Sequence, residues 1–162
     1  MTRLRSDPRI QLLTQIVDQA FHRKSWHGTT LKGSLRGLTV DMAIWRPTID
    51  RHNIWELTLH TAYWKYIVRR RLTRDKTLCF SRKPSNWPAL PEDATAKLLK
   101  EDVALLQSEH DLLLAAIREF PPSQLNKRAT ESQWTYAEHV HGIAAHDLYH
   151  AGQIQLLKKL RI

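Results

Sequence analysis

Hydrophobic residues recur every three or four positions along several stretches of the chain, with polar residues between them. This period is that of one face of an α-helix. It predicts four long helices, over residues 7–24, 53–72, 93–120 and 136–160. In the first stretch Asp7 is a suitable N-cap, and Pro8 suits the first helical position. The apolar face of this helix consists of Ile10, Leu13, Val17, Ala20 and Phe21.

Polar residues mark where two of the other helices begin. Asn53 stands three residues before Glu56, and the same spacing separates Thr135 from Glu138. Both pairs fit a capping box, in which each side chain accepts a hydrogen bond from the backbone N–H of the other residue. Two prolines that begin at Pro121 end the third helix, because proline cannot continue helical hydrogen bonding. The predicted boundaries therefore have local causes.

A long connector, residues 25–52, separates the first two predicted helices. Its leucines predict a short helix within residues 31–38, and Arg46 followed by Pro47 ends any helix there. No stretch shows the alternation typical of a strand. We therefore expect an all-α fold, with residues 1–162 forming a single domain. We expect a four-helix bundle in which the connector makes a long crossover between the first two helices.

Composition narrows the class of protein. Hydrophobic residues make up 42% of the 162 residues, enough for a packed core. No apolar run approaches the roughly 20 residues of a membrane-spanning helix, and the N-terminal segment lacks the apolar stretch of a signal peptide. A single cysteine, Cys79, excludes an internal disulfide and fits a reducing compartment. These features predict a cytoplasmic protein without a membrane partner.

The net charge of +9 leaves two interpretations open. A basic run over residues 65–76, beside Trp64, would suit contacts with the phosphates of a nucleic acid. The simpler interpretation is a solvated helix end, whose cations favour the negative end of the helix dipole. No nucleic-acid-binding motif accompanies the run, so we do not expect a nucleic-acid partner.

The segment HDLYHAGQ, residues 146–153, carries the most suggestive chemistry of the chain. His146 and His150 are four residues apart, so they lie one above the other on the same helix face. Spacing alone is weak support for a metal site. With nine histidines in 162 residues, roughly 0.5 pairs at this spacing are expected by chance. Ile143 and Leu157 share that face, however, and indicate that it is buried. Neutral imidazoles pointing inward could bind one transition-metal ion.

A third histidine, His60, lies in the predicted second helix. It stands among apolar residues, so it is either a core residue with a hydrogen-bonded ring or a third metal ligand. An inward pair on a neighbouring helix favours the ligand interpretation. Three histidines would leave positions open for water or substrate, as catalytic sites do. Trp55 and Trp64 flank His60 and are candidates for walls of its pocket.

Several other residues are candidates of lower rank. Glu56 is a candidate catalytic base, although its place in the capping box already explains a glutamate here. Gln153 lies one turn beyond His150 and could orient a ligand or bind water. For Asp147 we favour a salt bridge on the helix surface. His110 fits a core position, and His27 could reach a pocket mouth if the connector folds over the helices.

The two histidine segments together resemble a known family. IWELTLHTAYWK, containing His60, is followed by AHDLYHAGQ, containing His146 and His150, and this combination is similar to the DinB/YfiT-like metalloenzymes of the DinB superfamily. The resemblance covers the chain from the connector to the C-terminus. It implies a DinB-like four-helix bundle with a long crossover, often a homodimer, that binds one divalent metal through these three histidines. Relatives include thiol S-transferases and a mycothiol-dependent isomerase, but the separate C-terminal domain of that isomerase is not evident.

Two classes of function follow as hypotheses. In the first, the chain is an enzyme with one divalent transition metal, zinc or nickel, that activates water or a low-molecular-weight thiol. Its small-molecule substrate would then undergo hydrolysis or thiol transfer. In the second, the chain is a non-catalytic binding module that uses its basic surface for a nucleic acid or a regulatory partner. A metal that only stabilises the fold is a third interpretation.

Overall fold

The computed structural model describes residues 7–22, 25–83 and 85–161. This part of the chain is helical and contains no β-sheet, only an isolated bridge between Arg128 and Thr135. The predicted all-α class is therefore confirmed. The helices are α1 (Pro8–Phe21), α2 (Leu31–Ser34), α3 (Val40–Ile44), α4 (Ile54–Thr73), α5 (Ala96–Glu119), the 3-10 helix η1 (Pro122–Gln124) and α6 (Tyr136–Leu160).

The helix ends follow the local signals of the sequence closely. Both predicted capping boxes form, at the starts of α4 and α6. Asp7 caps α1 as expected, but this helix ends at Phe21; residue 24, the predicted end, lies outside the described residues. Helix α5 begins three residues later than predicted, because the hydroxyl of Thr95 accepts a hydrogen bond from the N–H of Leu98 and so fixes the N-cap. The connector holds a second short helix, α3, that the leucine pattern did not predict.

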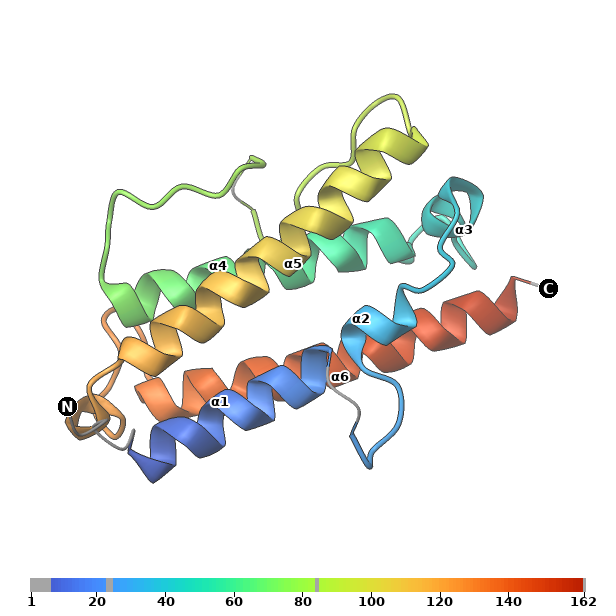
Figure 1. Cartoon of the computed structure of the whole chain (residues 1–162). Coiled ribbons are helices and arrows are strands. Elements are labelled where there is room, and N and C mark those ends of the chain that lie inside the picture. The colour runs from blue at the N-terminus through green and yellow to red at the C-terminus, as the bar shows by residue number, and fades with distance from the viewer. Residues whose placement is uncertain (1–6, 23–24, 84, 162) are drawn as a thin grey trace.

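Figure 1 shows how the four long helices lie against one another. Helix α4 packs against α5 and α6, and α1 packs against the same two helices. Helices α4 and α5 run in the same direction (Figure 1), so the segment between them has to return along α4. Two side-chain hydrogen bonds fix that return: Tyr66 donates to the carbonyl of Leu78 at 2.8 Å, and the Trp64 indole donates to the Asn86 side chain at 2.7 Å.

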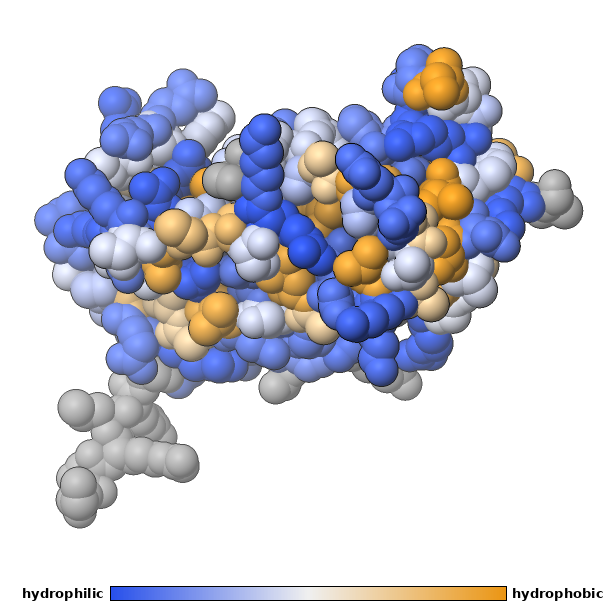
Figure 2. Space-filling model, turned by 90° about the horizontal axis from the view of Figure 1, so that it is seen from above, coloured by the Kyte–Doolittle hydropathy of each residue, from blue (hydrophilic) through white to orange (hydrophobic). Residues whose placement is uncertain are grey.

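Apolar side chains from all four long helices fill the interior. Trp55, Tyr136 and Phe21 are among the largest side chains that are fully buried. The face of the molecule seen in Figure 2 is mostly hydrophilic, with hydrophobic patches between the polar residues. This distribution agrees with the amphipathic pattern of the sequence. No helix in the described part of the chain is both long and apolar enough to cross a membrane.

Two residues of the basic run form buried ion pairs with other helices. Lys65 on α4 and Asp147 on α6 are both fully buried, with 2.5 Å between Nζ and Oδ2. The prediction of a surface salt bridge for Asp147 is therefore wrong: the residue after His146 points into the interface with α4. Arg69 is also buried, and it donates to Glu109 of α5 at 3.0 and 3.2 Å. Two cations of the basic run, Lys65 and Arg69, are thus buried in ion pairs inside the protein.

Candidate metal centre

Three histidines from two helices meet between α4 and α6. His60 comes from the middle of α4, while His146 and His150 come from successive turns of α6. The Nε2 atom of His146 lies 3.1 Å from Nε2 of His60 and 3.1 Å from Nε2 of His150. His60 and His150 are buried, and His146 is partly so. The structure therefore brings together the three residues that the sequence singled out as metal ligands.

The other ring nitrogen of two of these histidines is held by an acceptor. Nδ1 of His60 donates to the backbone carbonyl of Asn86 at 2.6 Å. Nδ1 of His150 lies 2.6 Å from Oε1 of Gln153 and donates to it in the same way. A neutral imidazole that donates from Nδ1 keeps a lone pair on Nε2. Both Nε2 atoms therefore present lone pairs to the centre of the cluster.

This donor set suits a metal ion. Nε2 of His146 can donate a proton to only one of its two neighbours, so hydrogen bonds within the cluster cannot satisfy all three nitrogens. Two nitrogens bound to one tetrahedral zinc ion at about 2.0–2.1 Å lie about 3.3 Å apart, close to the 3.1 Å separations seen here. The three histidines could therefore hold a metal ion.

Electrostatics keeps the cluster unprotonated. Burial, followed by the charges of the neighbouring histidines, lowers the pKa of His146 to about 3. Burial lowers the pKa of His150 to about 4, against the opposing effect of its bond to Gln153. Burial also lowers the pKa of His60. Because a metal competes with protons for the ring nitrogen, these shifts favour the ligating form at neutral pH.

The loop between α4 and α5 supplies two residues that the sequence did not indicate as part of the site. Trp87 lies between two imidazoles, stacked on His60 with 3.9 Å between ring centroids and on His52 with 3.5 Å. Its neighbour Asn86 accepts both from His60 and from Trp64. No local pattern in the sequence of this loop specifies which residue Trp87 would contact.

Two open cavities flank the histidine cluster, and His60 and His146 line both of them. The first has a volume of about 650 Å³, and its walls are largely apolar. They include Trp87, Tyr149 and Leu156. The second has a volume of about 820 Å³ and contains more polar groups. A small molecule in either cavity would lie against the histidines.

Two polar residues that line the second cavity, Arg71 and His139, contact each other. Nη1 of Arg71 lies 3.3 Å from Nδ1 of His139, whose Nε2 is 2.9 Å from the hydroxyl of Ser132. His139 lies about two helical turns before His146 on α6, and its ring nitrogens have these different partners. The second cavity is thus lined by a cation, Arg71, as well as by His60 and His146.

Glu56 has several partners of its own. Its carboxylate accepts two hydrogen bonds of 2.7 Å from Arg46 and one of 3.1 Å from the N–H of Asn53, and it lies 3.1 Å from His52. Burial raises its pKa, but the bonds from Arg46, Asn53 and His52 outweigh burial, and the net shift is downward. Glu56 is therefore ionised at neutral pH. It lines neither of the two cavities described above.

The remaining candidates differ in whether they line the two cavities. Trp64 lines the second cavity, as expected, but Trp55 points the other way and donates from its indole to Asp102 on α5. His110 is fully buried beside α1 and belongs to a different cluster, with Asp18. His27 is exposed, and it lines neither cavity.

Comparison with known proteins agrees with this site. The family model of the DinB superfamily matches residues 25–154, a span that includes all three clustered histidines and Gln153. No curated protein and no solved structure matches the chain. The match extends over most of the sequence, from the connector to the last turns of α6. The chain therefore belongs to the DinB superfamily.

Proposed function

We propose that this protein is a metal-dependent enzyme that binds one divalent transition metal, zinc or nickel, through His60, His146 and His150. The observation that carries the proposal is the convergence of three Nε2 atoms, two of them with lone pairs fixed by Nδ1 hydrogen bonds. A purely structural site normally fills its coordination with protein ligands. Three ligands facing two cavities are typical of a catalytic one.

The metal, when bound, would supply Lewis-acid chemistry that favours the deprotonated form of water or a thiol. The protein residues would then bind and orient the reactants. Asn86 and Gln153 hold the ring planes of His60 and His150, and such outer partners strengthen metal binding in general. In a thiol transfer, the sulfur would form a bond to an electrophilic carbon, the leaving group would depart with its bonding electrons, and the thiol proton would pass to solvent. In hydrolysis, water would take the place of the thiol.

The two cavities support a small-molecule substrate. The apolar walls of the first cavity suit the carbon skeleton of an electrophile. In the second, the Arg71 guanidinium suits an anionic group, such as the carboxylate of a low-molecular-weight thiol. The role of Glu56 as a base stays a prediction. Its partners support a positioning role, because it lies 3.1 Å from His52, which stacks on Trp87.

Further parts of the proposal concern the fold and the state of the protein. We infer a DinB-like four-helix bundle in which the connector after α1 is a long crossover. This inference is supported by the packing of both α1 and α4 against α5 and α6. A cytoplasmic homodimer is also proposed, as the family resemblance and the composition suggest.

Metal content tests the proposal directly. We would purify the untagged protein, incubate it with zinc, nickel or manganese, and measure metal per chain by plasma mass spectrometry. His146→Ala should lose about one equivalent relative to wild type, whereas His27→Ala, at an exposed position of the connector, should lose none. Equal metal content in wild type and His146→Ala would overturn the proposal.

Activity forms the second stage. The metal-loaded protein would be screened for alkylation of small thiols and for hydrolysis of activated esters and amides. Turnover should require both the metal and His146. A metal that stabilises the fold without any turnover would instead support the interpretation of the site as structural.

A binding module remains the second candidate, because the net charge is +9. The burial of Lys65 and Arg69 in internal ion pairs removes two cations from that surface. Titration with a short DNA duplex at low and moderate salt tests the idea, since phosphate contacts give steep salt dependence. Absence of binding at low salt would exclude it.

A further inference from the structure

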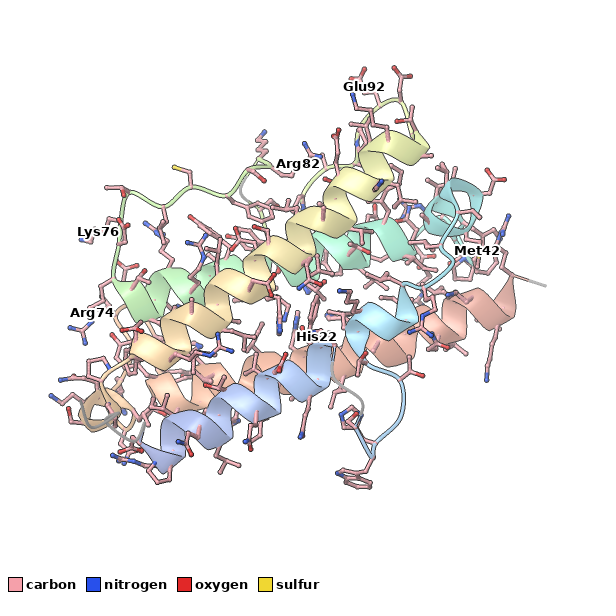
Figure 3. The ribbon with its side chains drawn as sticks, viewed as in Figure 1. His22, Met42, Arg74, Lys76, Arg82 and Glu92 are labelled. Atoms are coloured by element: carbon pink, nitrogen blue, oxygen red, sulfur yellow. The ribbon has the colours of Figure 1, made fainter. Side chains whose placement is uncertain are left out.

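A second group of metal-ligand residues lies where α1 meets α5, away from the three-histidine site. Nδ1 of His22 is 2.7 Å from Oδ1 of Asp18, one turn earlier, and Nε2 of His110 is 3.7 Å from the same oxygen. One ligand atom of each residue lies within 4.8 Å of the others. His22 lies at the C-terminal end of α1 (Figure 3), and His110 comes from the middle of α5.

His110 has an unusual environment for a polar side chain. It is fully buried and stacks on Phe21, with 3.8 Å between ring centroids. Among the described residues, neither of its ring nitrogens has a hydrogen-bond partner. A buried imidazole normally has at least one partner, because an unsatisfied polar group in the interior is costly. Its Nε2 faces the carboxylate of Asp18 at a distance too long for a hydrogen bond but short enough for both atoms to bind one ion.

We propose that Asp18, His22 and His110 form a second binding site for a divalent transition metal, independent of the three-histidine site. Two imidazole nitrogens and one carboxylate oxygen are ligands that zinc and its neighbours in the first transition series accept. Asp18 and His110 are buried, whereas the His22 side chain is 39% exposed. The ion would therefore enter from the His22 side. The carboxylate supplies a negative charge that the three-histidine site lacks.

The surroundings of this second site both favour and oppose metal binding. Burial, followed by the charge of Lys65, lowers the pKa of His110 to about 2, so the ring is neutral and free to ligate. The same Lys65 would repel a metal ion, but its ammonium group is paired with Asp147. We therefore expect a site that binds zinc reversibly and links the end of α1 to α5.

Zinc titration separates the two sites. The metal-free His146→Ala protein lacks the first site, and isothermal titration calorimetry should still find about one zinc ion per chain. In that background His22→Ala should weaken zinc binding by more than about tenfold, since loss of even an outer partner of a ligand costs 10–100-fold. Asp18→Asn should do the same, and His27→Ala, at an exposed position five residues on, should leave binding unchanged.

A second experiment measures metal binding by visible absorption and by melting temperature. Cobalt bound to nitrogen and oxygen ligands absorbs visible light, and this absorption in the His146→Ala protein should disappear in His146→Ala/His22→Ala. Zinc should raise the melting temperature of the first protein and not of the second. Circular dichroism checks that both are folded, which the exposure of His22 favours. If folded His146→Ala binds no zinc, or if His22→Ala and Asp18→Asn bind it as tightly as their parent, the proposal is wrong.

Discussion

Replacement of Lys65 tests how much stability is lost when one partner of a buried ion pair is removed. Lys65 and Asp147 are both fully buried and 2.5 Å apart. Burial lowers the pKa of Lys65 and raises that of Asp147, while each partner opposes the shift of the other. Lys65→Met would leave Asp147 without its partner in a fully buried position. Breaking a buried ion pair in this way typically costs about 3–5 kcal/mol.

This loss is a large fraction of the total stability of a domain, which is about 5–15 kcal/mol. At about 2–4 °C per kcal/mol for a chain of this size, the melting temperature should fall by roughly 6–20 °C. Lys65→Met/Asp147→Leu should recover most of the loss, because an apolar pair of similar volume needs no compensation for buried charge. The Oδ1 atom of Asp147, which has no hydrogen-bond partner among the described residues, disappears in the same double variant.

Thermal unfolding followed by circular dichroism on metal-free protein measures these changes. Metal must be removed because Asp147 follows His146 directly, and bound metal would stabilise the folded state by mass action. Lys100→Met, at an exposed position of α5, is the matched control and should change stability by less than about 0.5 kcal/mol. A Lys65→Met protein as stable as this control, or a double variant no more stable than Lys65→Met, would refute the reasoning.

Three further predictions concern the two histidine clusters. Gln153→Ala should weaken zinc binding at the three-histidine site by about 10–100-fold, because it frees Nδ1 of His150; competition with a chromophoric chelator measures this, and an unchanged affinity would contradict it. Trp87→Ala should weaken zinc binding in the same assay while leaving the helical circular dichroism intact, since it removes the ring stacked on His60; unchanged affinity would show that this stack does not position the ligand. The pKa of His110 is about 2 in the folded protein and about 6.5 in an unfolded chain. Between these two pH values, only the unfolded state binds a proton at His110. The contribution of His110 to the stability of the metal-free protein should therefore be complete above pH 6.5 and be lost as pH decreases, by about 1.4 kcal/mol per pH unit below about pH 5.5. Urea unfolding at several pH values should show a shallower decline for His110→Phe, and equal slopes would contradict the assigned burial.

The sequence by itself determined the local features of this protein. The period of apolar residues predicted the long helices, and the capping boxes at Asn53 and Thr135 set two of their starts to the residue. The same period placed His146 and His150 on one inward face. These features depend on residues within about one helical turn of one another, where backbone geometry leaves few alternatives. The three clustered histidines were therefore predictable from helix faces together with the family resemblance.

The contacts that shape the sites were decided only by the tertiary structure. Lys65 and Asp147 are 82 residues apart in the chain, and the local pattern of α6 assigned Asp147 to the surface. The position of Trp87 against His60 depends on how the loop after α4 returns along that helix. The approach of His110 to Asp18 likewise depends on how α1 packs on α5. Helix periodicity specifies which face a residue occupies, but the partner of that face follows from the packing of whole helices, which no short stretch of sequence contains.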